Sequence, residues 1–228
     1  NPSPSDITAG SVTLTLTAYG NPPCNPIIST KTLTIRRPMT AVAGTAITTC
    51  SSAGAVNITT GSSATYHTIV TWTSSGTGTF TNPNSLTTCT YAPSAADITA
   101  GSVTLTLTAS NGGCTDVIST KTMTISTLPT AVAGAALSTC ATAAAINITG
   151  GSSATNQTGV TWTSSGTGTF TNANSLTLCT YNPSAADKTA GSVTLTLTAT
   201  GIAPCANATS TKVLTISRVM TAAAGTAI

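Results

Sequence analysis

Charged and acid–base side chains are scarce in this sequence of 228 residues. Only 5% of the residues are Asp, Glu, Lys or Arg, whereas an ordinary globular chain carries about a quarter. Glutamate is absent, four Asp supply all the acid, and His67 is the single histidine. This inventory disfavours paired-carboxylate catalysis and a metal site with several His or acidic ligands. We therefore predict no enzyme, no catalytic residue, no metal ligand and no cofactor.

Basic patches and long apolar runs are missing as well. The seven Lys and Arg are scattered, far from the basic stripe that follows a phosphate backbone, so we predict no nucleic-acid partner. Thr or Ser interrupts every apolar stretch, and a spanning helix needs roughly 18 apolar residues. Direct membrane insertion is therefore not expected. No basic segment followed by an apolar one opens the chain, so no signal peptide is expected.

Seven cysteines accompany the single histidine, and no Cys-x-x-Cys pair occurs. Zinc sites usually show paired Cys or mixed Cys and His ligands at short spacing. Structural cysteines without such spacing are typical of oxidising compartments. The sequence therefore indicates an extracellular location.

What the chain does contain is an internal repeat. The segment Val70–Asn82, VTWTSSGTGTFTN, recurs unchanged at residues 160–172. The segment ITAGSVTLTLTA occurs at residues 7–18 and 98–109, with a near copy at 188–199. The period of 90 or 91 residues corresponds to one small domain.

Four segments follow from this period. They are the C-terminal part of a truncated repeat (1–36), two full repeats (37–126 and 127–217), and the first strand of a following repeat (218–228). The two partial segments together lack the whole middle of a repeat and cannot complete each other. We expect the chain to be an interior segment of a longer tandem array.

Each repeat is predicted to be all-β, with an immunoglobulin-like β-sandwich fold. In residues 102–109, Val103, Leu105 and Leu107 alternate with threonines, which is the period of a half-buried strand. We expect strands in the first full repeat near residues 40–48, 54–59, 68–74, 78–81, 86–91, 102–109 and 120–126. Seven short strands around one Trp are typical of this fold, and Trp72 and Trp162 are the expected core anchors.

A more specific resemblance rests on two runs. They are WTSSGTGTFTNPNSL, from Trp72, and YAPSAADITAGSVTLTLTA, from Tyr91. Together with the loop cysteine that follows, they resemble the Ig/PKD-like tandem repeats of large Bacteroidetes cell-surface adhesins, including gliding-motility adhesins and other type IX secretion substrates. The resemblance covers both full repeats and implies a secreted, surface-attached array. Such repeats usually serve as stalk, so the resemblance implies no particular ligand.

The cysteines number three per full repeat. They are Cys50, Cys89 and Cys114, then Cys140, Cys179 and Cys205, with Cys24 in the truncated copy. At least one thiol per repeat is therefore free or bonded elsewhere. In an immunoglobulin-like strand order, the first and second cysteines of a repeat lie towards one pole and the third towards the other. Bridged Cα atoms lie within about 7 Å, so geometry favours Cys50–Cys89 and Cys140–Cys179.

This geometry leaves Cys24, Cys114 and Cys205 for inter-domain or intermolecular bonds. They lie in the loop between the last two strands of each copy, strands F and G of an immunoglobulin-like fold, which we call the F–G loop. The resemblance to the adhesin repeats instead implies a bond between cysteines placed like Cys50 and Cys114, or a bridge across a domain junction. Both possibilities stay open at this point.

One lysine in each copy of the last strand (Lys31, Lys121, Lys212) has the parity of the inward apolar residues. Two interpretations remain: a lysine at the strand edge, in a salt bridge or with its ammonium reaching solvent, and a Lys–Asn isopeptide crosslink.

The expected function is mechanical. We predict a structural stalk segment of a secreted, surface-attached bacterial adhesin or fibre, contacting neighbouring repeats of its own chain and adding about 40 Å of reach per domain. One alternative is a building block of a multi-chain extracellular filament or sheath made of identical chains. Another is a glycan-binding module using Tyr66 and His67, which lie in the loop where the two full repeats differ most.

Overall fold

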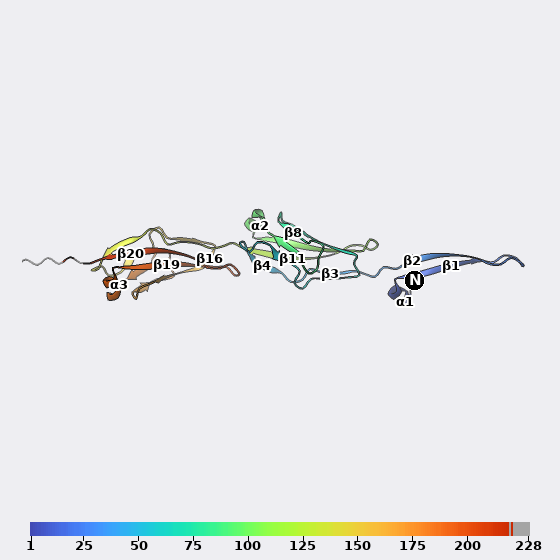
Figure 1. Ribbon diagram of the computed structural model, residues 1–228, viewed down its shortest axis with the longest axis horizontal. Helices are drawn as coiled ribbons and strands as arrows, with labels where there is room; N and C mark the ends of the chain where they lie inside the picture. Colours follow the sequence, from blue (N-terminus) through green and yellow to red (C-terminus); the bar gives the residue numbers. More distant parts are fainter. Residues whose placement is uncertain (219, 221–228) are drawn as a thin grey trace, which may run out of the picture. The chain divides into compact units, whose positions relative to one another are not determined.

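The computed structural model describes residues 1–218 and 220 (Figure 1). The all-β class and the tandem immunoglobulin-like sandwiches are confirmed, because strands arranged in sheets recur at matching positions of the two full repeats. The strand predicted at 218–228 lies almost entirely outside the described residues. The domain boundaries at 36/37 and 126/127 stay predictions.

The first full repeat contains nine strands and one short helix among its described residues. They are β3 (Thr40–Val42), β4 (Ile47–Cys50), β5 (Val56–Asn57), β6 (Ser63–Thr65), β7 (Ile69–Ser74), β8 (Thr79–Thr81), β9 (Thr90–Ala92), α2 (Ala95–Ala100), β10 (Ser102–Ser110) and β11 (Val117–Ser126).

The second full repeat has the same order of elements. They are β12 (Thr130–Val132), β13 (Leu137–Cys140), β14 (Ile146–Asn147), β15 (Ser153–Thr155), β16 (Gln157–Ser164), β17 (Thr169–Thr171), β18 (Thr180–Asn182), α3 (Ala185–Ala190), β19 (Ser192–Gly201) and β20 (Ala208–Ser217). The truncated copy supplies α1 (Pro4–Ala9), β1 (Ser11–Ala18) and β2 (Ile27–Thr34).

The sheets of the two full repeats have the same topology. The larger sheet has the order β4-β11-β10-β7 in the first repeat and β13-β20-β19-β16 in the second. The facing sheet has the order β5-β9-β8 or β14-β18-β17, and β3-β6 or β12-β15 form a separate pair. The pairing of β13 with β20 is parallel, whereas β16 and β19 pair in antiparallel fashion.

The single strand expected at 40–48 is two strands, because the chain bends at Gly44. This glycine has φ of +87°, and a Cβ there would lie 2.4 Å from the carbonyl oxygen of Thr60. A side chain is excluded by both facts. The bend moves the chain from pairing with β6 to pairing with β11, and this switch carries Cys50 to the end of β11.

The strand expected at 86–91 was also too long, since β9 begins only at Thr90. The hydroxyl of Ser85 accepts hydrogen bonds from the backbone N–H groups of Thr87 (3.1 Å) and Thr88 (3.0 Å). A local side-chain acceptor of this kind competes with strand pairing. The segment is therefore a turn before β9.

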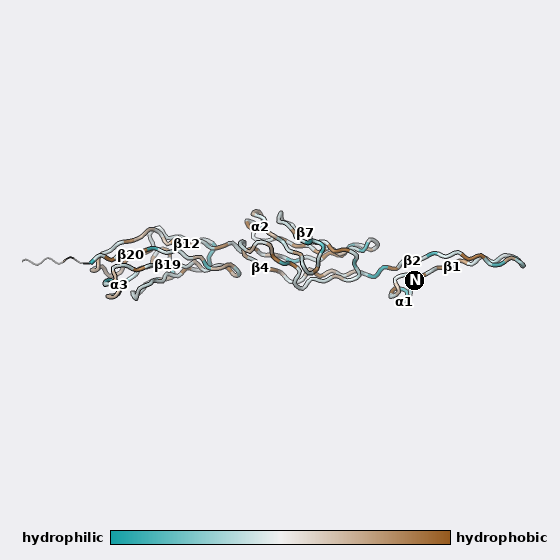
Figure 2. The backbone as a smooth tube through the Cα atoms, viewed as in Figure 1, coloured by the Kyte–Doolittle hydropathy of each residue, from teal (hydrophilic) through white to brown (hydrophobic). Residues whose placement is uncertain are grey.

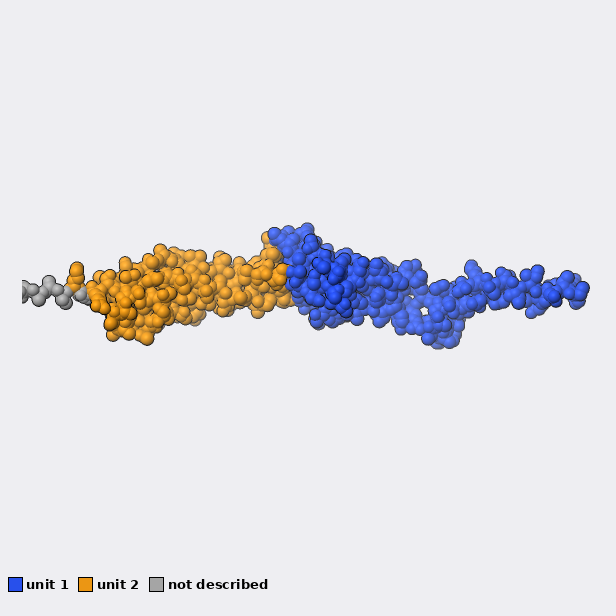
Figure 3. Space-filling view, in the orientation of Figure 1, with its two compact units in different colours: residues 1–47, 55–97, 102–123 blue, residues 48–54, 98–101, 124–228 orange. Residues whose placement is uncertain are grey.

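The described chain divides into two compact units (Figure 3). One consists of residues 1–47, 55–97 and 102–123, and the other of residues 48–54, 98–101 and 124–228. The turn at 48–54, which belongs to the first full repeat by sequence, thus belongs to the second unit by its contacts.

The interior of each sandwich is built from alternate residues of the long strands. Trp72 and Trp162 are each 1% exposed, and Leu105 and Leu107 are fully buried. Burying a large apolar side chain contributes about 1.5–3 kcal/mol relative to leaving it exposed.

The truncated copy keeps the same alternation in its sequence. Its strands β1 and β2 form a hairpin without covering strands (Figure 2). Leu14 and Leu16, which correspond to Leu105 and Leu107, are 51% and 71% exposed. The described hairpin therefore leaves uncovered the apolar face that a full repeat buries.

A buried carboxylate fixes the helical turn before the last hairpin of each repeat. Asp97 is 3% exposed. It accepts hydrogen bonds from the hydroxyl of Tyr91 (2.7 Å) and from the backbone N–H groups of Thr77, Gly78 and Ser94. Burial raises the pKa of Asp97, but the hydrogen bonds from Ser94, Tyr91 and Thr77 together outweigh it and lower the pKa to about 2.

The lysine of the last strand is buried. Lys121 is 5% exposed, its ammonium donates a hydrogen bond to the carbonyl of Ile58, and Nζ lies 5.1 Å from the centre of the Trp72 ring. Burial lowers the pKa of this ammonium. Lys212 makes the same contacts in the second repeat. The strand-edge position expected for these lysines is therefore wrong, because the carbonyl and the ring compensate for the water lost on burial.

Candidate functional site: a disulfide between the repeats

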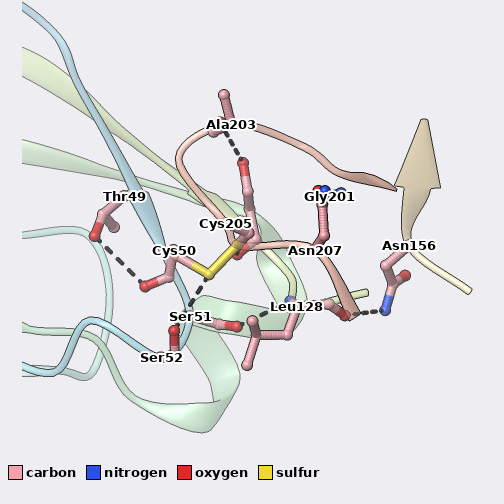
Figure 4. Close-up of a disulfide and its surroundings, with 11 residues drawn as sticks. Thr49, Cys50, Ser51, Ser52, Leu128, Asn156, Gly201, Ala203, Cys205 and Asn207 are labelled. Atoms are coloured by element: carbon pink, nitrogen blue, oxygen red, sulfur yellow. Dashed lines mark hydrogen bonds between the residues drawn. A yellow bond between two sulfur atoms is a disulfide. The ribbon is translucent and has the colours of Figure 1, made fainter. Parts of the chain in front are cut away.

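A disulfide joins Cys50 of the first full repeat to Cys205 of the second (Figure 4). The two cysteines are 155 positions apart in sequence, and both lie in the second compact unit. Their Cα atoms are 5.0 Å apart, which is within the usual range for a bridge. Each half-cystine is 8% exposed.

The turn after β4 positions Cys50. The N–H of Ser51 donates to the carbonyl of Ser126 (2.8 Å), and the N–H of Ala53 donates to the carbonyl of Cys50 (2.9 Å). Cys50 is thereby held beside Ser126, the last residue of β11.

The loop between β19 and β20 positions Cys205. Its N–H donates to the carbonyl of Ile202 (2.9 Å), and the N–H of Gly201 donates to Oδ1 of Asn207 (3.1 Å). A Cβ at Gly201 would lie 2.6 Å from the carbonyl oxygen of Cys205, so the loop closes this tightly only with glycine. The sulfur of Cys205 lies 3.2 Å from the carbonyl oxygen of Ser126. A disulfide sulfur carries no proton, so this is a packing contact.

The first residues of the second repeat are held by neutral hydrogen bonds. The N–H of Leu128 donates to the hydroxyl of Ser51 (3.3 Å), and the carbonyl of Leu128 accepts from the amide of Asn156 (3.1 Å). The backbone N–H and carbonyl of Leu128 are thus both hydrogen-bonded, one to a side chain of the first repeat and the other to a side chain of the second.

The pairings Cys50–Cys89 and Cys140–Cys179 are wrong. Cys89 and Cys179 are free thiols, both fully buried in the sandwich cores. Burial raises the pKa of each thiol to about 11, against the opposing effect of Lys121 or Lys212. Both cysteines therefore behave as small apolar core residues.

The physical reason lies in the direction of strand β4. The equivalent β13 runs parallel to β20, from Leu137 opposite Leu214 to Cys140 opposite Ser217. The second half of the split first strand therefore ends where the chain leaves the repeat. The loop between β19 and β20 lies beside the same end of β11, since the sulfur of Cys205 contacts the carbonyl oxygen of Ser126. This topology brings Cys50 and Cys205 together, whereas spacing within one repeat could not reveal the pair.

The remaining cysteines, Cys24, Cys114 and Cys140, are exposed free thiols in the structure. Two of them, Cys24 and Cys114, belong with Cys205 to the F–G loops, and Cys140 is the equivalent of Cys50.

The candidate contact loop is used within the chain. The guanidinium of Arg37 lies 5.0 Å from the centre of the Tyr66 ring and donates to its hydroxyl (3.3 Å). The same side chain donates to the carbonyls of Ile7 and Thr8. The Nδ1 atom of His67 is buried without a hydrogen-bond partner. Tyr66 is thus held by the residue that follows the truncated copy.

Within residues 1–218 and 220, no three His, Cys, Asp or Glu side chains are grouped closely enough to hold a metal ion. The same residues include no helix of the length and apolarity needed to cross a membrane.

No protein-family model matches this sequence, and no curated protein matches it. Solved structures of cadherin repeats are similar in part. A protocadherin gamma C5 fragment, EC1-3, shares 11% identity at a TM-score of 0.45, over 93% of this chain and 80% of that one. Drosophila N-cadherin EC1-4 shares 11% identity at a TM-score of 0.45, over 85% and 52%. At these values the likeness carries no argument about partners or activity.

Proposed function

We propose that this chain is a load-bearing stalk segment outside the cytoplasm, in which successive β-sandwich repeats are bonded to one another across their junction. The observation that carries this proposal is the Cys50–Cys205 bridge, because it connects two repeats that are already continuous in sequence. A second covalent connection adds nothing to a catalytic centre. It adds resistance to separation and bending at the junction.

The composition supports an extracytoplasmic array. Disulfides persist in oxidising compartments, and a nearly uncharged, Thr-rich sequence recurs in every copy. A property shared by all copies points to a role distributed along the chain. We infer that the protein is a structural element and not an enzyme.

The origin that fits best is a Bacteroidetes surface adhesin exported by type IX secretion and attached to the cell surface. This part of the proposal rests on the resemblance of the two runs beginning at Trp72 and Tyr91. In such a protein the segment holds a binding tip away from the cell.

Two measurements test the proposal. Antibodies against the oxidised chain are expected to label intact cells, and the label is expected to disappear after brief external proteolysis. The purified chain, added in excess, is expected not to compete with whole cells for attachment and to give no signal on a glycan array. A stalk connects and does not bind.

The opposite results would overturn the proposal. Competition by the isolated chain, or glycan binding lost in Tyr66→Ala, would make this segment a binding module. Labelling seen only after cell lysis would place it in the cytoplasm.

A further inference from the structure

The three exposed thiols lie at positions equivalent to those of the two bonded cysteines. Cys140 corresponds to Cys50, and Cys24 and Cys114 correspond to Cys205. The backbone hydrogen bonds around Cys24 and Cys140 match those of the bonded cysteines, whereas the N–H of Cys114 donates to a side chain three residues upstream. Each of the three cysteines belongs to a repeat whose neighbouring copy is incomplete or absent among the described residues.

Cys140 reproduces the surroundings of Cys50. The N–H of Ala141 donates to the carbonyl of Ser217 (2.8 Å), and the N–H of Ala143 donates to the carbonyl of Cys140 (2.9 Å). These bonds match those of the turn after Cys50, with Ser217 in place of Ser126. The two turns differ in exposure, because Cys50 is buried by its bonded loop and Cys140 is exposed. They also differ in sequence, since Ala141 stands in place of Ser51.

Cys24 and Cys114 reproduce the loop of Cys205. The N–H of Cys24 donates to the carbonyl of Asn21 (3.0 Å), and the N–H of Cys114 donates to Oδ1 of Asn111 (3.0 Å). In both cases the acceptor lies three residues upstream, as it does for Cys205.

The F–G loop of the first full repeat lies beside Arg36, the residue equivalent to Ser126. A Cβ at Gly113 would clash with the side chain of Arg36, and Arg36 is the equivalent of Ser126, against which Cys205 packs. The loop that carries Cys114 therefore returns to the junction before its own repeat. Cys50 and Cys140 lie in the turn after the first part of their repeat, which we call the A–B turn. Residues 1–36 contain no A–B-turn cysteine that could meet Cys114.

We propose that Cys24, Cys114 and Cys140 are half-cystines of the same bridge, each bonded to the neighbouring copy of this repeat in the array. The rule is that the A–B-turn cysteine of one repeat bonds the F–G-loop cysteine of the next. It accounts for the odd number of cysteines, because two of the three in each repeat serve two different junctions and the third stays buried as a thiol. The inference rests on the proposed stalk function and extends it to every junction.

Each bridge forms by thiol–disulfide exchange. Two thiols are oxidised to one S–S bond, and a small-molecule or protein disulfide is reduced to two thiols, taking up the two protons and two electrons. The exposure of all three thiols allows this reaction.

The test lengthens the existing chain by one copy of its own second repeat. Residues 1–217 are followed directly by a second copy of residues 127–217. The new junction then joins Ser217 to Thr127 of the added copy, as Ser126 is joined to Thr127 in the natural sequence. The protein is refolded with oxidised and reduced glutathione, free thiols are alkylated, and the bridges are mapped by mass spectrometry.

The expected result is a bond between Cys140 and the added copy of Cys205, with Cys50 still bonded to the original Cys205. Cys140 is also expected to lose at least 90% of its alkylation relative to the 228-residue chain. In the Cys140→Ser variant of the longer chain, where only the original Cys140 is replaced, the added copy of Cys205 is expected to be alkylated. The bridge between Cys50 and the original Cys205 is expected to be unchanged.

Three results would overturn the inference: an added Cys205 that stays alkylated beside intact Cys140, a bond between Cys140 and Cys179, or bonds between separate chains. The last result would favour a multi-chain filament. None of them bears on whether the 228-residue chain binds surfaces, so failure here is distinguishable from failure of the stalk function.

Discussion

The Cys50–Cys205 bridge predicts how the chain responds to a pulling force applied at its two ends. Force passes from the first strands to Cys50, crosses the disulfide, and continues from Cys205 along the last strand. The 155 positions between the two cysteines carry no load. Strands β5 to β19 can then unfold without lengthening the molecule.

The magnitude follows from the length of the closed loop. An extended chain spans at most about 3.3–3.6 Å per residue, so the loop conceals about 500–560 Å of contour length. In single-molecule pulling, the oxidised chain is expected to release that much less length than the same chain in dithiothreitol. The Cys205→Ser variant is expected to release the full length without reductant.

Cys114→Ser is the matched control, since this cysteine occupies an F–G loop but has no bond in this chain. It is expected to behave like the unaltered chain. If the oxidised chain and Cys205→Ser released the same contour length, the bridge would not lie in the path of the force. That result would contradict a load-bearing role for the Cys50–Cys205 bridge.

Further predictions concern the cores and the thiols. Because the pKa of Asp97 falls from 3.8 to about 2, its contribution is fully present above pH 4 and is lost as pH falls through 2. Acid is therefore expected to remove about 2 kcal/mol from the unfolding free energy of the first full repeat. In urea titrations of Asp97→Asn this contribution should be absent, while that of the equivalent Asp187 in the second repeat remains. Lys121→Ala removes a buried stem and should destabilise its repeat by about 2–5 kcal/mol, whereas Lys31→Ala, at the exposed equivalent, should change urea stability little. Iodoacetamide is expected to modify Cys140 in the native chain but Cys89 only after unfolding; equal rates would contradict the burial.

Periodicity predicted most of the fold. The alternation around Leu105 identifies a strand in any context, and a single Trp among many short strands is typical of the sandwich. The bend at Gly44 was not predictable from alternation, because a strand that changes sheets keeps its polar and apolar pattern. Its cause is a close approach to Thr60, far along the chain.

The predicted partner of Cys50 was wrong for a related reason, although Cys205 was expected to be available for an inter-domain bond and forms one. Distances between cysteines within one repeat exclude the correct partner, because the partner belongs to the next copy. Cys24 and Cys50 are 26 positions apart, as are Cys114 and Cys140. This constant spacing follows from the repeat period and identifies no pair, since Cys50 and Cys89 and the equivalent Cys140 and Cys179 also keep a constant spacing, of 39 positions. The sequence shows the inward parity of Lys121, but burial of its ammonium depends on the ring of Trp72, which sequence alone does not place.

That constant spacing has a consequence for a fully bridged array. Each bond joins two adjacent repeats and bypasses the residues between its two cysteines, so a covalent route alternates between a 26-residue segment and a disulfide and advances two repeats at a time. Two such routes, one starting from odd repeats and one from even repeats, run side by side. A 26-residue segment spans at most about 90 Å, close to the roughly 80 Å of two folded domains. Two parallel covalent routes would therefore limit the extension of the array to little more than its folded length, even when its domains unfold.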